Sequence, residues 1–491
     1  MTTSRVPKAL RVVLAATAGA ALAACAVGPD YVRPKAETPA AFKEADDAGQ
    51  WKTAAPADAQ GRGTWWKAFG DPKLDALLEQ VNVSNQNVAA FEARFRQARA
   101  LVEAARAAYF PTLSAGASYN RFQQSQTVGN AKFAPRGTFT DYSAPLQASW
   151  EVDVWGKLRR ALEAQQASAQ ASAADLESTR LSAQAELAAD YFQLRGIDAQ
   201  RALLDSTIAA YQKSLQLTVN RYNSGVAARA DIEQADTQLK TTQAQAIDLG
   251  VQRAQLEHAI AILIGKAPAE FSLLPLPLDA QPPPIPAGLP SELLERRPDI
   301  ASAERQVAAA NAQIGVAKAA YFPTLTLGAS AGFESAPAAQ WLTWPSRFWS
   351  VGPALAETIF DAGLRKAQTE QAIAAYDATV ATYRQTVLAA FQDVEDNLAA
   401  LRVLAEEAKA QDAAVQAAAR SVVYTTNQYK AGVVSYLNVV TAQATELSNR
   451  LTAAGIAQRR MTAAVNLIRA LGGGWSAGEL PGADALLTGS R

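Results

Sequence analysis

A seven-residue segment, AAYFPTL, occurs twice in this chain, at residues 107–113 and again at 319–325. The offset is 319 − 107 = 212 residues, close to half of the chain once its N-terminal leader is set aside. Chance rarely produces an identity of this length, and the sequence around each copy repeats as well. The chain is therefore built from two copies of one unit, and that unit constrains the fold.

Each copy of the segment marks a change of period. A helix that begins at Asp71-Pro72 is predicted to run to about Tyr109 and to end at Pro111. Apolar and polar residues then alternate, which predicts β-hairpins over 112–153 and 324–359, although Glu357 falls on the apolar face of the second. Such strands are typical of a transmembrane β-barrel, but a soluble, half-buried hairpin gives the same alternation.

A long helix is predicted after each hairpin, over 158–222 and 364–429. At 1.5 Å per residue each would be roughly 100 Å long. Heptad spacing in the second, from Leu401 through Asp412 to Tyr429, predicts a coiled coil. Gly225 and Gly432 fit the residue after each helix, where positive φ is needed, and return helices are predicted to follow.

These patterns divide the chain into a leader, an arm, two repeats, a proline-rich connector and a tail. The boundaries are 1–24 for the signal peptide, 25–64 for the arm, 65–264 for the first repeat with its return helix at 231–264, 265–298 for the connector, 299–471 for the second repeat with its return helix at 436–471, and 472–491 for the tail.

The leader has a basic start and an apolar stretch that is too short to span a bilayer comfortably, which is typical of a secretory signal peptide. It ends Leu22-Ala23-Ala24-Cys25, which is similar to a bacterial lipobox. We therefore expect N-acyl and S-diacylglycerol lipid on Cys25; the alternative is plain signal cleavage beside an incidental cysteine. Ala26, by analogy with bacterial lipoproteins, suggests sorting to the outer membrane.

Composition excludes several classes of function. Lys+Arg and Asp+Glu are both 46, so no charge excess indicates a nucleic-acid partner. With one His, one Cys and no nucleotide-binding loop, the chain offers no metal site, no cofactor site and no catalytic set, and an enzyme is not expected. No apolar run of about 20 residues follows the leader, as a transmembrane helix would need.

Two hairpins supply only four strands, whereas a closed membrane barrel needs at least about eight. Either the chain pools strands with copies of itself, three copies giving 3 × 4 = 12, or the hairpins are not in a membrane.

The chain resembles the TolC-like outer-membrane factors of tripartite efflux systems, in the OprM/NodT-type lipoprotein branch. The resemblance is carried by CAVGPDYVRP at 25–34, WWKAFGDP at 65–72, GLPSELLERRPDI at 288–300, AANAQIGVA at 309–317 and ALGGGW at 470–475. It implies an α+β membrane protein: a homotrimer with a 12-stranded transmembrane β-barrel, continuous with a periplasmic α-helical coiled-coil barrel and a mixed equatorial domain. It also implies an outer-membrane exit duct that exports small molecules passively, with a periplasmic adaptor and an inner-membrane pump of RND type as partners.

The resemblance places a gate where the helix turns converge. Leu437 matches the family's apolar constriction ring, and Thr441 matches a position at which related channels carry an acidic residue. Because Thr441 has no charge, Asp231 and Glu233 are the alternative gate carboxylates, unless Asp231 is only a helix N-cap.

The two turns would be the tip to which the adaptor docks. Its residues are Arg221, Tyr222, Gly225, Tyr429 and Gly432, and the alternative for both tyrosines is packing within the chain.

Two other functions share parts of this pattern: the outer component of a type I protein-secretion system, and a structural coiled-coil lipoprotein that spans the envelope. Single-channel conductance separates a channel from a tether, and the phenotype of a gene deletion separates drug efflux from protein secretion.

Overall fold

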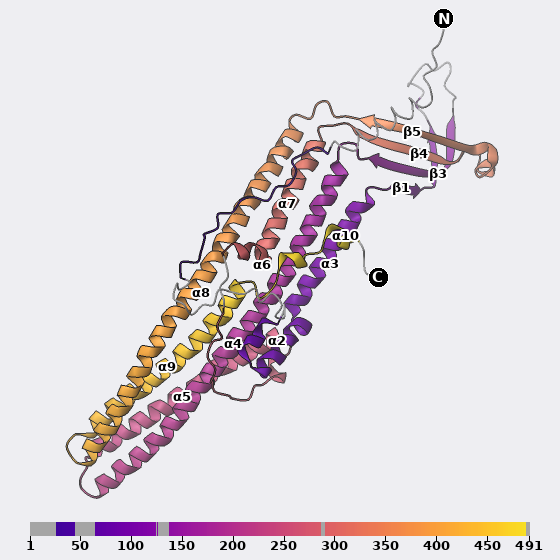
Figure 1. Ribbon diagram of the computed structural model, residues 1–491. Coiled ribbons are helices and arrows are strands. Elements are labelled where there is room, and N and C mark those ends of the chain that lie inside the picture. The colour runs from indigo at the N-terminus through magenta and orange to yellow at the C-terminus, as the bar shows by residue number, and fades with distance from the viewer. Residues whose placement is uncertain (1–25, 45–63, 124, 126–136, 286–289, 488–491) are drawn as a thin grey trace.

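The computed structural model describes residues 26–44, 64–123, 125, 137–285 and 290–487. The molecule is elongated, with a β-sheet at one end, long helices running away from it and two helical turns at the opposite end (Figure 1). The predicted signal peptide and Cys25 lie outside the described residues.

The first repeat contains four α-helices, three strands and a short 3-10 helix among its described residues. They are η1 (Trp65–Phe69), α2 (Pro72–Ser84), α3 (Gln86–Ala107), β1 (Thr112–Ala115), β2 (Ser118–Gln123), β3 (Thr138–Val152), α4 (Lys157–Asn223) and α5 (Arg229–Leu263).

The second repeat follows the same order, after a connector that holds η2 (Pro268–Glu270), η3 (Pro290–Glu292) and α6 (Leu293–Arg296). Its elements are α7 (Pro298–Ala319), β4 (Thr324–Ser335), η4 (Ala338–Gln340), η5 (Trp344–Ser346), β5 (Arg347–Ala356), α8 (Leu364–Lys430) and α9 (Tyr436–Ala470). The tail forms η6 (Ala477–Glu479) and α10 (Ala483–Leu487), and α10 packs on α3 and α4.

The prediction of one helix from Pro72 to Tyr109 is wrong, because the chain breaks at Asn85 between α2 and α3. Asn85 is buried, and its side-chain oxygen accepts hydrogen bonds from the backbone N–H groups of Asn87 (2.9 Å) and Val88 (3.1 Å). Its amide donates to the carbonyl of Leu263 at 2.8 Å. A side-chain cap of this kind starts a new helix, so a residue that looks like an interior polar position is a boundary.

The strands form one antiparallel sheet in the order β1-β3-β4-β5, and β2 also pairs with β3. The first predicted strand is therefore two pieces, β1 and β2, that pair with successive parts of β3. Glu357 lies beyond the end of β5, so it does not interrupt the apolar face of the sheet as the sequence had suggested.

The helices next to the sheet lie in the same order as the strands to which they connect. α3 packs on α4, α4 on α7 and α7 on α8. Because α3 leads into β1, β3 into α4, α7 into β4 and β5 into α8, the sheet and the helical layer form one continuous wall (Figure 1).

Away from the sheet, each long helix pairs with its return helix, α4 with α5 and α8 with α9, and α4 also packs on α9. The predicted seam of α8 is wrong at Asp412, which is exposed; Gln411 instead donates to the Asn449 side chain in α9 at 2.9 Å. The two largest apolar clusters lie midway along the molecule. They include Trp66, Tyr191 and Leu187 in one, and Tyr383, Val387 and Leu467 in the other.

No described helix is both long enough and apolar enough to cross a membrane.

Asp190, on α4 beside the first of these clusters, should make stability depend on pH. Burial, and then repulsion from Glu186, raise its pKa from 3.8 to about 6. A carboxyl group whose folded pKa is raised destabilises the fold above that pKa, and this penalty is relieved as the pH falls toward 3.8. As the pH falls from 7.5 to 5, protonation of Asp190 should therefore raise the free energy of unfolding by about 1 kcal/mol.

Asp190→Asn should remove this contribution and be more stable than the wild type at pH 7.5. Denaturant titrations at both pH values check the prediction, with Asp248→Asn, an exposed site on α5, as the control. An Asp190→Asn variant with an unchanged pH profile would contradict it.

Candidate functional site

The duplicated segment lies where each repeat passes from helix to strand. Tyr109 and Phe110 lie two and three residues beyond the end of α3, and Pro111 precedes β1. Tyr321, Phe322 and Pro323 stand in the same positions between α7 and β4. Proline lacks a backbone N–H and cannot continue a helix, so it ends each helix at this level. We call these two places the joints.

An aspartate fixes the start of the long helix beside each joint. The Asp153 carboxylate accepts hydrogen bonds from the backbone N–H groups of Leu158 and Arg159, both at 2.9 Å, and pairs with the Arg159 guanidinium at 3.4 Å. Asp361 does the same for Arg365, at 3.2 Å to its N–H and 2.6 Å to its guanidinium. The Arg365 side chain thereby holds the pKa of the Asp361 carboxyl below its usual value. We call Asp153 and Asp361 with their arginines the aspartate clamps; neither was predicted from the sequence.

Tryptophans tie the joints to neighbouring strands and helices. The indole of Trp150 donates to the carbonyl of Tyr109 at 2.9 Å, and that of Trp155 donates to the carbonyl of Pro323 at 2.8 Å. Trp155 also stacks on Phe322 with ring centroids 4.8 Å apart. An aromatic belt of this kind marks the edge of many membrane barrels.

The sheet has one apolar and one polar face, because side chains opposite each other in adjacent strands share a face. The apolar face includes Leu113, Leu146, Ala148, Trp150, Leu325, Leu327, Ala329, Ala331, Phe333, Trp349, Val351 and Leu355. The polar face includes Ser114, Gln147, Ser149, Thr326, Ser330 and Ser350. Val351 and Leu355 are 73% and 70% exposed, so the apolar face is uncovered. Sheets with one apolar and one polar face occur in transmembrane β-barrels, and also in soluble proteins whose sheet is covered on one face.

The N-terminal arm begins at the joints. The Val27 N–H donates to the carbonyl of Trp155 at 3.0 Å, and Asp30 pairs with Arg160 at 2.8 Å. Gly28, at φ +110°, lies so close to Gly315 of α7 that a side chain there would overlap its backbone. The arm thus places Ala26, its first described residue, beside Gly156 at this end of the molecule.

The opposite end of the molecule, the tip, consists of two tight turns. Gly225 and Gly432 follow α4 and α8 at φ +76° and +77°, and nothing lies near enough to restrict a side chain at either. The next N–H in each turn closes it, from Val226 to Arg221 and from Val433 to Gln428, both at 2.9 Å. Both glycines are thus required by the backbone conformation alone.

The two turns are joined to each other through Tyr429. This side chain is buried, with the Arg221 guanidinium 4.7 Å over its ring and the Tyr436 ring 5.2 Å away. Arg221 also donates to the carbonyl of Lys430 at 3.2 Å. Tyr429 therefore packs within the chain, whereas Tyr222 is 41% exposed at the end of the molecule.

Two further residues join the repeats near the tip: the hydroxyls of Ser214 and Tyr436 lie 2.9 Å apart. Neither residue was predicted from the sequence. Burial raises the pKa of Tyr436. The only signal in the sequence is the seven-residue spacing of Tyr429 and Tyr436.

The proposed gate residues lie in the first turns of the return helices. Leu437 is 54% exposed, and the exposed Thr441 hydroxyl donates to the Leu437 carbonyl at 2.9 Å. Asp231 is not a helix N-cap, because Ala228 occupies that position and the Asp231 N–H bonds to its carbonyl at 3.1 Å. Glu233 is exposed, and its carboxylate oxygen lies 3.6 Å from the Arg229 guanidinium. Among the described residues, no hydrogen bond or ion pair links Asp231 or Glu233 to Leu437 or Thr441.

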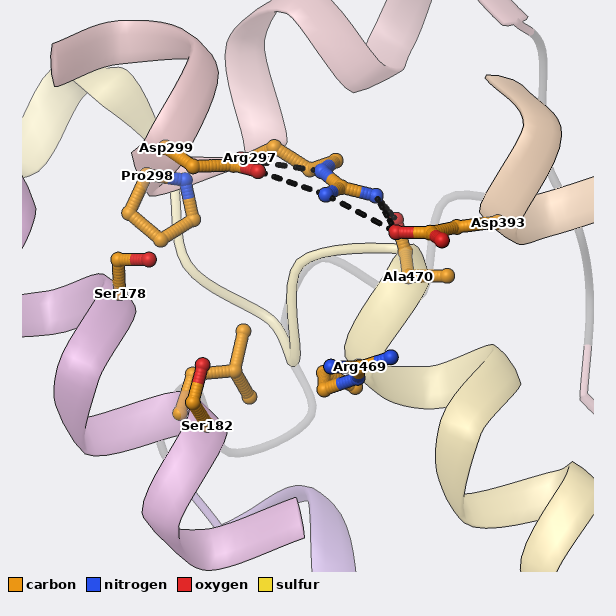
Figure 2. Close-up of a pocket in the computed structure, with 9 residues that line it drawn as sticks. Ser178, Ser182, Arg297, Pro298, Asp299, Asp393, Arg469 and Ala470 are labelled. Atoms are coloured by element: carbon orange, nitrogen blue, oxygen red, sulfur yellow. Dashed lines mark hydrogen bonds and ion pairs between the residues drawn. The ribbon is translucent and has the colours of Figure 1, made fainter. Parts of the chain in front are cut away.

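A small cavity of about 100 Å³ lies midway along the molecule, where α7, α8 and α9 meet α4 (Figure 2). Arg297 pairs with Asp299 at 2.6 Å and with Asp393 at 3.3 Å, and donates to the carbonyl of Ala470 at 3.2 Å. The guanidinium thus joins three helices, which is a structural role. Among the described residues, no group of three or more His, Cys, Asp or Glu side chains could hold a metal ion.

A family model described as outer membrane efflux protein matches residues 77–266 and 289–473. The chain is 33% identical over 432 residues to the pyoverdine export outer membrane protein OpmQ of Pseudomonas aeruginosa, covering 87% of this chain and 91% of that protein. It is 34% identical over 461 residues to the toluene efflux pump outer membrane protein TtgC of Pseudomonas putida, covering 92% and 93%.

Solved structures give the same result. The outer-membrane channel OprN superposes with a TM-score of 0.84 at 32% identity, covering 92% of this chain and 100% of that one. The open state of the Neisseria gonorrhoeae MtrE outer membrane channel gives 0.77 at 27% identity, covering 92% and 99%.

Proposed function

The chain belongs to the outer membrane efflux protein family. We propose that three copies of it join into one barrel that serves as the exit duct of a tripartite efflux pump. The resemblance found in the sequence is confirmed, and with it the assignment to outer-membrane efflux channels, a family of transport ducts and not of enzymes. We further propose that the assembly is a trimer with one transmembrane β-barrel, and we assign roles to individual residues.

The observation that carries the proposal is the continuous wall. Four strand positions, apolar on one face and polar on the other, continue in the same order into four packed helices. The strands at both edges, β1 with β2 on one side and β5 on the other, are paired on one side only. Exposed edges are not tolerated in lipid, so the wall must be closed by other copies. Three copies supply 3 × 4 = 12 positions, above the minimum of about eight.

We place the apolar face of the sheet in the outer membrane and the helices in the periplasm. Cys25 would carry the lipid anchor, since the arm holds the next residue at the joints. Mass spectrometry of the N-terminal peptide tests this: a diacylglyceryl and acyl adduct on Cys25 is expected, and an unmodified N-terminal cysteine or cleavage elsewhere would contradict it.

At the tip, Leu437 and Thr441 would line the constriction, and Asp231 and Glu233 of the first repeat would supply its carboxylates. The exposed Tyr222 and the turns at Gly225 and Gly432 would contact the periplasmic adaptor. The inner-membrane pump, which we expect to be of RND type, would supply the energy, so the duct itself needs no chemistry. Two relatives are named for the export of pyoverdine and of toluene, which supports small organic molecules as cargo.

Single-channel recording in a planar lipid bilayer tests the proposal and the closure of the tip together. Arg221→Ala removes the cation over Tyr429 and the hydrogen bond to Lys430, the contacts that join the two turns. Cation–π contacts are worth about 0.5–2 kcal/mol, so the open fraction should rise by roughly 2- to 30-fold over a small wild-type conductance.

The control for this variant is Lys240→Ala, which removes an exposed cation from α5 away from the proposed gate residues and should leave the conductance unchanged. The proposed duct function would be overturned if neither the wild type nor Arg221→Ala conducted ions while both were folded and inserted in the bilayer. Equal conductance increases in both variants would overturn the role given to Arg221.

A further inference from the structure

Each repeat carries a cation four residues before the phenylalanine of its joint. Arg106 precedes Phe110 in the first repeat, and Lys318 precedes Phe322 in the second. Both cations are exposed, and Phe110 and Phe322 are 60% and 38% exposed. The same arrangement therefore occurs at the same place in both repeats.

Arg106 and Lys318 differ from the other cations near the joints. Lys157 pairs with Glu151 at 3.0 Å, and Arg159 and Arg365 are held by the two aspartate clamps. In the part of the chain that the structure describes, the side chains of Arg106 and Lys318 have no ion-pair or hydrogen-bond partner. These two positive charges are therefore not needed to neutralise carboxylates of the same chain.

Their position in the fold indicates what they face. Asn311 and Gly315 of α7 contact the N-terminal arm, and Lys318 follows Gly315 on the same face of that helix. The arm begins there, with Ala26 against Gly156. Each cation is about one helical turn, roughly 5 Å, from its phenylalanine on the side away from the sheet. An apolar ring toward the membrane with a cation one turn below it matches the boundary between acyl chains and phosphate groups.

We propose that Arg106 and Lys318 bind the phosphate groups of anionic phospholipids in the leaflet that meets the helices. The inference rests on the proposed function, because only a sheet inserted in the membrane brings a leaflet to the joints. The exposed Phe110 and Phe322 favour a lipid over free phosphate, since they offer contact to acyl chains that inorganic phosphate lacks. Anionic headgroups attract cations at this level more strongly than zwitterionic ones.

The test measures lipid retention by the purified full-length protein in detergent. The protein is titrated with short-chain phosphatidylglycerol, short-chain phosphatidylcholine or inorganic phosphate, and bound molecules are counted by native mass spectrometry. The double variant Arg106→Gln with Lys318→Gln is compared with Lys240→Gln with Lys409→Gln, two exposed cations on α5 and α8. We expect the first to bind phosphatidylglycerol about tenfold more weakly than the wild type, and the control to match the wild type.

Three results would overturn the proposal: equal phosphatidylglycerol binding by the double variant and the wild type, no preference over phosphatidylcholine, or equally tight binding of inorganic phosphate.

Cations at a helix C-terminus also stabilise the helix itself. Circular dichroism melts address this: loss of lipid binding with an unchanged melting temperature supports a lipid site, and equal loss in the control variant overturns it. Conductance of the double variant in a pure phosphatidylcholine bilayer should equal that of the wild type. Wild-type protein that retains phosphatidylglycerol but never conducts would count against the duct and not against this site.

Discussion

Ala329→Arg should abolish assembly in the outer membrane. Ala329 lies at the middle of β4 on the apolar face, opposite Ala148 in β3 and Val351 in β5. An arginine at the midplane of a transmembrane barrel costs about 2–4 kcal/mol, and a trimer carries three copies, so the loss should be roughly 6–12 kcal/mol per assembly. We expect the amount of folded protein in outer-membrane fractions to fall below detection on semi-native gels, where the wild type gives a clear band.

The adjacent residue provides the control. Ser330 lies on the polar face, where its hydroxyl is 2.8 Å from that of Ser350. Ser330→Arg would place the same charge on the polar face, toward the interior of the proposed barrel, so the protein should insert and conduct, with altered ion selectivity. If both variants inserted equally well, the apolar face would not be in contact with lipid and the orientation of the sheet would be wrong.

Gly472→Ala should destabilise the fold by about 3 kcal/mol, from backbone strain together with steric overlap. Gly472 follows α9 at φ +92°, where a methyl group would overlap the carbonyl oxygen of Arg296 at the end of α6. That carbonyl precedes Arg297, so a shift of the backbone would also disturb the ion pairs with Asp299 and Asp393. Denaturant titration of the purified protein measures the effect.

Gly432→Ala is the matched variant. It has a similar positive φ of +77°, but a methyl group there would meet no atom within 4 Å. It should cost only about 1 kcal/mol, since the backbone strain alone remains. A Gly472→Ala variant no less stable than Gly432→Ala would mean that the contact with Arg296 is not tight in solution.

Much of the candidate site could be located from the sequence because it depends on local patterns. The duplicated proline segment marked both joints, and the glycine turns marked the tip, since proline ends helices and glycine permits positive φ wherever they occur. The alternation in 324–335 separated the two faces of β4 without knowledge of its neighbours. Asn85 was missed because a polar residue in a helical pattern looks the same whether it faces water or caps a buried helix end.

The sequence by itself determined the duplication, the change from helix to strand and the length of the long helices, because periodicity and helix-ending residues act over a few positions. It also determined the family, through segments spread over most of the chain. Only the tertiary structure decided in which order the strands pair and which helices pack side by side, that Tyr429 is buried under Arg221, and that Trp155 bonds to Pro323. The Arg221–Lys430 hydrogen bond joins residues 209 positions apart, and the Trp155–Pro323 bond joins residues 168 apart. Such contacts depend on how the two repeats pack against each other, and no local pattern encodes that.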